Sequence, residues 1–182
     1  EEFTPLYAKW TGSGDHFGFM NQPAAGFANY QVLVESVVPL IVAARETHTG
    51  KEVRSESIVQ EFIVEAKQIF ETKTDEIFNQ KLGLPHDADV GQDLWTSLQP
   101  LMKDSRTDRT IFWRQLTYIM QQFPDLDSAD YDGMMTLLEG EVGSDQSPFY
   151  ESLTAEKRRE WIAWMKDWRE TLKATKRPSI VV

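Results

Sequence analysis

The glycine-rich segment Gly12–Gly18 is the first part of the sequence whose residue types could bind a nucleotide phosphate. Phosphate-binding loops place Gly-x-Gly-x-x-Gly between a strand and a helix, or follow the last glycine with Lys and Ser or Thr. The segment here reads Gly-Ser-Gly-Asp-His-Phe-Gly and continues with Phe19, so it meets neither pattern. It therefore does not predict a nucleotide site.

Four aspartates between Asp125 and Asp132 carry carboxylates, which are ligands that calcium prefers. An EF-hand loop needs Gly at its sixth position and Glu at its twelfth. Counted from Asp125, these positions hold Asp130 and Thr136, so the segment does not fit that loop. A solvated acidic loop is the favoured interpretation, and a weak surface cation site is the alternative.

Histidine and cysteine, the usual ligands of transition metals, do not form a recognisable site. His16, His48 and His86 are far apart, and none belongs to a His-x-x-x-His or Glu-x-x-His pair. The chain has no Cys, which excludes disulfides, zinc–thiolate sites, iron–sulfur clusters and Cys nucleophiles. The residues therefore predict no catalytic group, no metal site and no cofactor. The alternative is that a single His ligates the metal of a pigment or haem held by a partner.

Composition and charge narrow the classes of partner. The chain has 182 residues, of which 41% are hydrophobic, enough for one globular domain. Its net charge of −10 opposes binding to nucleic acids and to anionic membrane surfaces. The apolar run Val32–Ala44 is interrupted by Glu35 and Pro39, and is shorter than the ~20 residues of a membrane-spanning helix. Because the first residue is Glu1, we expect a processed chain or a fragment.

Hydrophobic residues recur at helical spacing along most of the chain, so we predict an all-α fold. The clearest helix begins at the plausible N-cap Ser55 and ends at Leu82, before the stop signal Gly83. A first helix is expected at 27–47. Further helices are expected at 90–103, at 108–123, at 132–139 and from 154 onward.

These helices form one predicted domain of five or six helices at 27–177, between an irregular N-terminal arm at 1–26 and a short tail at 178–182. The arm alternates glycines with aromatic residues, which need a surface to pack on, so it either lies on the chain's own helices or docks on a partner. In the last helix, Trp164 falls beside the apolar stripe, so we expect it to be exposed. The residues expected to contact a partner are Trp10, Phe17, Phe19, Trp164, Ile180, Val181 and Val182.

Several motifs resemble motifs of the C-terminal region of the selenoprotein O family and occur in the same order. Members of this family are kinase-fold protein adenylyltransferases. Asn21–Pro23 is similar to the family's Asn-Gln-Pro segment, although Ala28 stands where the family has Trp. Lys81–Leu84 resembles a Lys-Leu-Gly-Leu helix end, and residues 108–116 resemble an Asp-Tyr-Thr-x-Phe-Phe-Arg-x-Leu motif. Trp161–Leu172 looks like the family's late helix.

The resemblance implies a helical region that packs on a kinase-like core. The family's nucleotide-binding Lys, Glu, Asn and Asp lie upstream of Glu1, so the resemblance implies no catalytic residue in this chain. Many members also carry a redox-type selenocysteine or Cys near the C-terminus. This chain has neither, so no redox role is implied.

We therefore expect a protein that is not an enzyme. It would be a non-catalytic helical scaffold or linker subunit of a photosynthetic or respiratory assembly, in the soluble phase of a chloroplast or mitochondrion. Its expected partners are protein subunits, with peripheral contact to a membrane complex and no membrane span. The alternative is a C-terminal fragment of an adenylyltransferase, which would transfer AMP from ATP to protein hydroxyls with magnesium.

Overall fold

The computed structural model describes residues 2–3, 18–141 and 146–175. Within these residues the secondary structure consists of six α-helices, one 3-10 turn and two isolated β-bridges, with no strand of a sheet. The all-α class with five or six helices is therefore confirmed.

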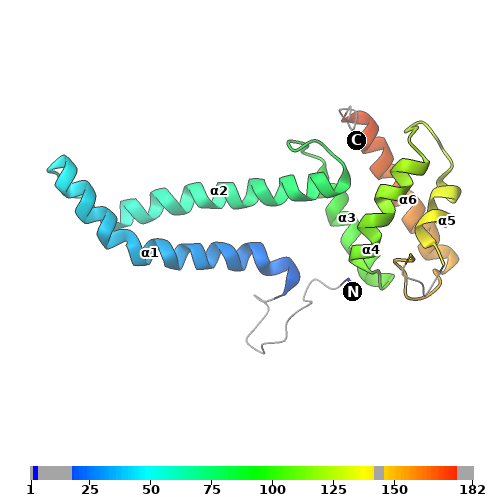
Figure 1. The fold of residues 1–182 in the computed structure, drawn as a ribbon, viewed down its shortest axis with the longest axis horizontal. Helices are drawn as coiled ribbons and strands as arrows, with labels where there is room; N and C mark the ends of the chain where they lie inside the picture. The colour runs from blue at the N-terminus through cyan, green and yellow to red at the C-terminus, as the bar shows by residue number, and fades with distance from the viewer. Residues whose placement is uncertain (1, 4–17, 142–145, 176–182) are drawn as a thin grey trace. The chain divides into compact units, whose positions relative to one another are not determined.

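The helical domain divides into two compact units, which we call the hairpin and the bundle (Figure 1). The hairpin is Pro5–Thr74, and the bundle combines Glu1–Thr4 with Asp75–Val182. The hairpin is therefore an insertion within the chain of the bundle. The long helix α2, at Ser55–Leu82, begins in the hairpin and ends in the bundle.

In the hairpin, α1 (Gln22–Thr49) follows the 3-10 turn η2 (Phe19–Asn21). The helix begins before the predicted range 27–47 because Pro23 lies in its first turn. Proline is favourable there, since its missing N–H would have no intrahelical partner and its fixed φ suits a helix. At the other end, Gly50 adopts a φ of +64°, the left-handed conformation in which glycine ends helices.

Apolar side chains hold α1 against the first part of α2. Val34 and Val38 of α1 are buried together with Ile58 of α2. The rings of Phe27 and Phe70 meet edge-on, with their centroids 5.8 Å apart. Figure 1 shows the two helices side by side within the hairpin.

The bundle contains the end of α2 and four further helices. These are α3 (Gly91–Asp104), α4 (Arg109–Gln122), α5 (Tyr131–Glu139) and α6 (Ala155–Ala174). α6 packs against α3 and α5, and α5 also packs against α4. Asp108 is the N-cap of α4, because its carboxylate accepts a hydrogen bond from the backbone N–H of Ile111 in the first turn.

Three tryptophans of α6 each donate an indole hydrogen bond to a different part of the bundle. The bonds run from Trp161 to Ser105 Oγ, from Trp164 to the Leu94 carbonyl and from Trp168 to the Leu82 carbonyl, at 2.9, 3.1 and 2.8 Å. Trp164 is only 3% exposed, so the expectation that it is exposed is wrong. The reason is that α3 and α5 both pack on α6, which buries residues beside the main apolar stripe as well.

Trp95 of α3 contacts the two stretches of chain that flank the hairpin. Its ring meets Phe3 edge-on, with centroids 6.1 Å apart, and stacks on Phe78 of α2 with centroids 4.3 Å apart. The backbone N–H of Phe3 also donates to the Thr107 carbonyl at 2.6 Å. The bundle therefore holds the chain both before and after the hairpin.

Candidate functional site

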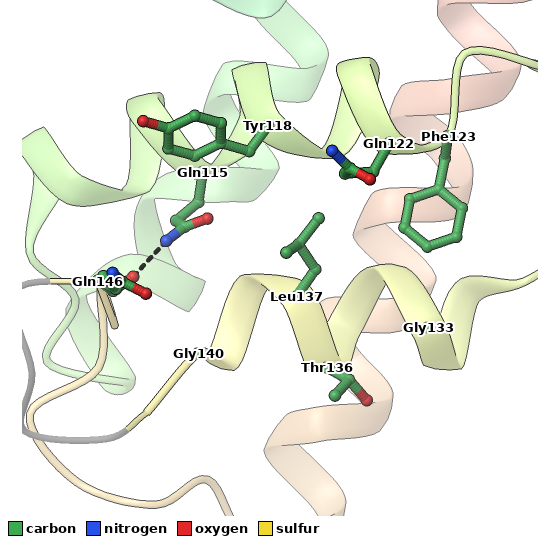
Figure 2. A pocket seen from close by; sticks show the side chains of 9 residues that line it. All are labelled: Gln115, Tyr118, Gln122, Phe123, Gly133, Thr136, Leu137, Gly140 and Gln146. Atoms are coloured by element: carbon green, nitrogen blue, oxygen red, sulfur yellow. Dashed lines mark hydrogen bonds between the residues drawn. The ribbon is translucent and has the colours of Figure 1, made fainter.

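A pocket of about 600 Å³ lies between α4 and α5 in the bundle (Figure 2). Ligand sites in proteins commonly have volumes of ~300–1,000 Å³. The residues that line the pocket are Gln115, Tyr118, Gln122, Phe123, Gly133, Thr136, Leu137, Gly140 and Gln146. Because none of these nine described residues has a side chain that ionises at neutral pH, the pocket suits a neutral group.

Gln115 gives the pocket a specific polar group. Its side chain is 6% exposed, and its Nε2 donates a hydrogen bond to the carbonyl of Gln146. A carbonyl can only accept, so this bond fixes which end of the Gln115 amide is the oxygen. That atom, Oε1, is buried and accepts no hydrogen bond from the described residues. The wall of the pocket therefore contains a buried acceptor without a donor.

Gln115 was not among the site residues predicted from the sequence. On α4, Phe112, Leu116 and Ile119 are buried, and Gln115 lies on the same face because it follows Phe112 by three residues. A glutamine within the apolar stripe was the available signal. It could not locate a pocket by itself, because the opposite wall comes from α5, and only the fold brings α5 against α4.

A buried cation supports one end of the pocket. Arg169 of α6 is fully buried and donates hydrogen bonds to the carbonyls of Phe123, at 3.0 Å, and Asp125. These carbonyls follow the last turn of α4, where the partial negative charge of the helix end favours a cation. Burial lowers the pKa of Arg169. The arginine thereby fixes Phe123, which lines the pocket.

The acidic segment at 125–132 has structural partners in the bundle. Asp130 accepts a hydrogen bond from the Gly133 N–H at 2.9 Å and so caps α5. Asp132 forms an ion pair with Arg158 of α6 at 2.5 Å. Across the described ranges, no group of three or more His, Cys, Asp or Glu side chains is arranged to hold a metal ion.

The residues expected to contact a partner do not form one described site. Trp10, Phe17 and the tail at 180–182 lie outside the described residues, as does most of the glycine-rich segment. Phe19 begins η2 in the hairpin. Trp164 lies in the core of the bundle, where a partner could not reach it without unfolding the helices around it.

One side of α1 is a second candidate surface. Leu33 and Leu40, which lie two turns apart on that side, are 57% and 73% exposed. We call the side of α1 defined by these two residues the apolar side. Large apolar patches on soluble proteins mark interaction sites, and two exposed leucines on one side of a helix make this surface a candidate interface.

α1 also has the length and composition of a helix that could cross a membrane, with 28 residues and a mean hydropathy of 1.5 over its most apolar window. It is the one such helix among the described residues. The run Val32–Ala44 is too short to span a membrane, but the whole of α1 is longer than this run. The conclusion drawn from the run therefore does not apply to the whole helix. A single apolar helix near an N-terminus is weak evidence for a membrane span, because core helices and signal sequences have the same properties.

Two curated proteins, both named protein nucleotidyltransferase YdiU, are similar to this chain. The one from Flavobacterium johnsoniae is 33% identical over 103 residues, which is 57% of this chain and 17% of the relative. The one from Lachnoclostridium phytofermentans is 31% identical over 122 residues, which is 66% of this chain and 24% of the relative. The match thus spans less than a quarter of the length of either relative. No solved structure matches the chain.

The family described as protein adenylyltransferase SelO has a sequence model that matches residues 1–181, nearly the whole chain. This match confirms the resemblance found in the motifs. It also corrects the expectation that the protein is not an enzyme, because the family and both relatives are nucleotidyltransferases. That expectation was wrong because it was drawn from the missing catalytic motifs of a chain that matches only part of each relative. The chain belongs to the SelO family of protein adenylyltransferases.

Proposed function

We propose that this chain is the helical region of an enzyme that transfers AMP from ATP to hydroxyl groups of proteins. The observation that carries the proposal is the match of the SelO family over residues 1–181. In this reaction the acceptor oxygen forms a bond to the α-phosphorus of ATP. The bond between that phosphorus and pyrophosphate breaks, and the proton of the hydroxyl goes to a base or to water.

The helical region has a supporting role in this proposal. The similarity covers 17% and 24% of the two relatives, so most of such an enzyme lies outside the matched region. We place the binding of ATP and magnesium in that remainder. The region described here then acts by packing against the remainder and holding it in its active arrangement.

The apolar side of α1 is the surface that we assign to this packing. Leu33 and Leu40 are largely exposed, although burying a Leu side chain is favourable by roughly 1.5–3 kcal/mol. The other side of α1 is already used, because Val34 and Val38 face Ile58 of α2. The remainder of the enzyme would belong to the same protein, so one copy of it is present for each copy of α1. It can therefore cover the apolar side of α1 permanently. The location of the protein in an organelle stays a prediction.

The proposed reaction is tested with the natural protein that carries this chain. The protein is incubated with magnesium and ATP labelled at the α-phosphate, together with a protein acceptor, and label on protein is measured. We expect the label to become attached to protein. Treatment with nuclease-free phosphodiesterase should then release it as AMP. With α,β-methylene-ATP, in which the bond to be broken is replaced, no AMP should be transferred. Label from the γ-phosphate instead of the α-phosphate would overturn the proposal and indicate a kinase.

A further inference from the structure

We propose that the pocket between α4 and α5 binds a peptide segment, which inserts one apolar side chain and donates one backbone N–H to Gln115 Oε1. The two walls and the position of Gln115 are seen in Figure 2. Nothing in this proposal depends on AMP transfer, because the pocket lies wholly within the bundle and its ligand is bound rather than modified.

The unpartnered acceptor indicates what the ligand must contain. A buried acceptor without a hydrogen bond costs roughly 1–3 kcal/mol, so a group that supplies the donor is favoured by removing that cost. Gln115 Oε1 is such an acceptor, and the amide cannot turn over, because its Nε2 is bound to the Gln146 carbonyl. The ligand therefore brings an N–H or O–H donor to this wall.

The rest of the lining indicates a mostly apolar, uncharged ligand. Phe123 and Leu137 present apolar side chains, and Tyr118 presents an aromatic ring at the edge. Among the residues that the structure describes, no lysine or arginine lines the pocket, which disfavours phosphates, nucleotides and carboxylates. Gln122, Thr136 and Gln146 add polar groups to the lining, but of the described lining residues only Gln115 has a buried side-chain acceptor without a donor. A sugar would need partners for several hydroxyl groups, whereas one unpartnered acceptor suits a ligand with a single donor. A peptide combines an apolar side chain with a single N–H donor at each residue.

Gln115 Oε1 is covered in the empty pocket, so the ligand must move a side chain to reach it. Tyr118 is the candidate, because it lies three residues along α4 from Gln115 and is 51% exposed. An exposed tyrosine can change its χ1 rotamer on a fast timescale and without disturbing the core. Binding is therefore expected to shift Tyr118 while α4 and α5 keep their positions.

The test uses two probes, one with amide hydrogen-bond donors and one in which methyl groups replace those donors. One is N-acetyl-leucyl-leucinamide, and the other is the same compound with every amide nitrogen fully methylated. Binding of each to the natural protein that carries this chain is measured by saturation-transfer NMR, with titration to obtain Kd. We expect the unmethylated probe to bind roughly tenfold more tightly, the effect of one hydrogen bond to a buried acceptor.

Substitutions then locate the binding. Gln115→Met removes the acceptor and should remove most of the preference for the unmethylated probe. Thr136→Trp, at an exposed position that lines the pocket, should abolish binding of both probes while leaving the core intact. Thr117→Trp is its matched control, because Thr117 is also an exposed helical threonine that bonds the carbonyl four residues earlier but does not line the pocket.

Each outcome decides the proposal. Tighter binding of the unmethylated probe that is mostly lost in Gln115→Met supports it, and so does loss of binding in Thr136→Trp but not in Thr117→Trp. Binding that is unaffected by Thr136→Trp would overturn it, because the site would lie elsewhere. No binding of either dipeptide would overturn it, and saturation transfer to maltose would then indicate a carbohydrate site.

Discussion

The ring of Phe3 packs edge-on against the indole of Trp95, with the two ring centroids 6.1 Å apart. Phe3 precedes the hairpin in the sequence, and Trp95 follows it. The contact therefore closes a loop of chain that contains the whole hairpin. Because Phe78 stacks on the same indole, both connections to the hairpin meet at Trp95.

Phe3→Ala should destabilise the bundle by about 3 kcal/mol, because it removes a buried ring from an aromatic cluster. The side chain of Phe3 is only 3% exposed, although it lies at the start of the chain. The free energy of unfolding is measured by urea titration with tryptophan fluorescence. Tyr118→Ala is the control, since this half-exposed ring should cost less than about 1 kcal/mol. Equal effects of the two substitutions would show that Phe3 does not contribute to the core.

Arg169→Met should destabilise the bundle by about 3 kcal/mol. The methionine fills part of the space but leaves the carbonyls of Phe123 and Asp125 without their buried donor. Thermal and urea unfolding measure the loss. Arg159→Met, at an exposed position of the same helix, is the matched control and should be nearly neutral. A neutral effect of Arg169→Met would mean that water replaces the guanidinium at the end of α4.

The stability of the hairpin should fall in acid through Glu61. The hydrogen bonds from Arg45, at 2.9 and 3.1 Å, lower the pKa of Glu61. In the unfolded chain the pKa returns to its ordinary value of about 4.3. The pair therefore stabilises the fold fully above that value, and this contribution is lost as the pH falls through the lowered pKa of the folded state.

This pH dependence is measured as the urea midpoint between pH 7 and pH 3 for the wild-type chain and for Glu61→Gln. The wild type should lose more stability than the variant over the acidic part of this range. The effect should be small, because both side chains are exposed. Glu65→Gln, one turn further along α2, is the control and should follow the wild-type curve. Parallel curves for the wild type and Glu61→Gln would contradict the role of the pair.

Local signals in the sequence predicted the positions of the helices well. They did not predict which helices pack against one another. Ser55 and Gly83 are start and stop signals that act within a few residues, and α2 lies between them at Ser55–Leu82. The burial of Trp164 depends on helices packing on two sides of α6, which the spacing of one helix does not reveal. The pocket was missed for the same reason, because Gln115 needs α5 as the opposite wall.

The proposed role of the apolar side of α1 makes a prediction for the natural protein. The double substitution Leu33→Glu with Leu40→Glu should reduce AMP transfer at least tenfold, since two charges would enter the surface that packs against the rest of the enzyme. Both residues are largely exposed in this chain, so the free energy of unfolding of the hairpin should change little. The control is Gln31→Glu with Thr47→Glu, two exposed polar positions of the same helix that receive the same charge.

AMP transfer by these two double variants and the wild type, measured side by side with α-labelled ATP, is the most direct measurement. We expect transfer by the wild type and by the Gln31 and Thr47 variant, and a loss of at least tenfold in the Leu33 and Leu40 variant, with unchanged helix content by circular dichroism. Equal transfer by all three proteins would contradict the assignment of the apolar side as the packing surface. Absence of AMP transfer by the wild type would contradict the proposed reaction itself.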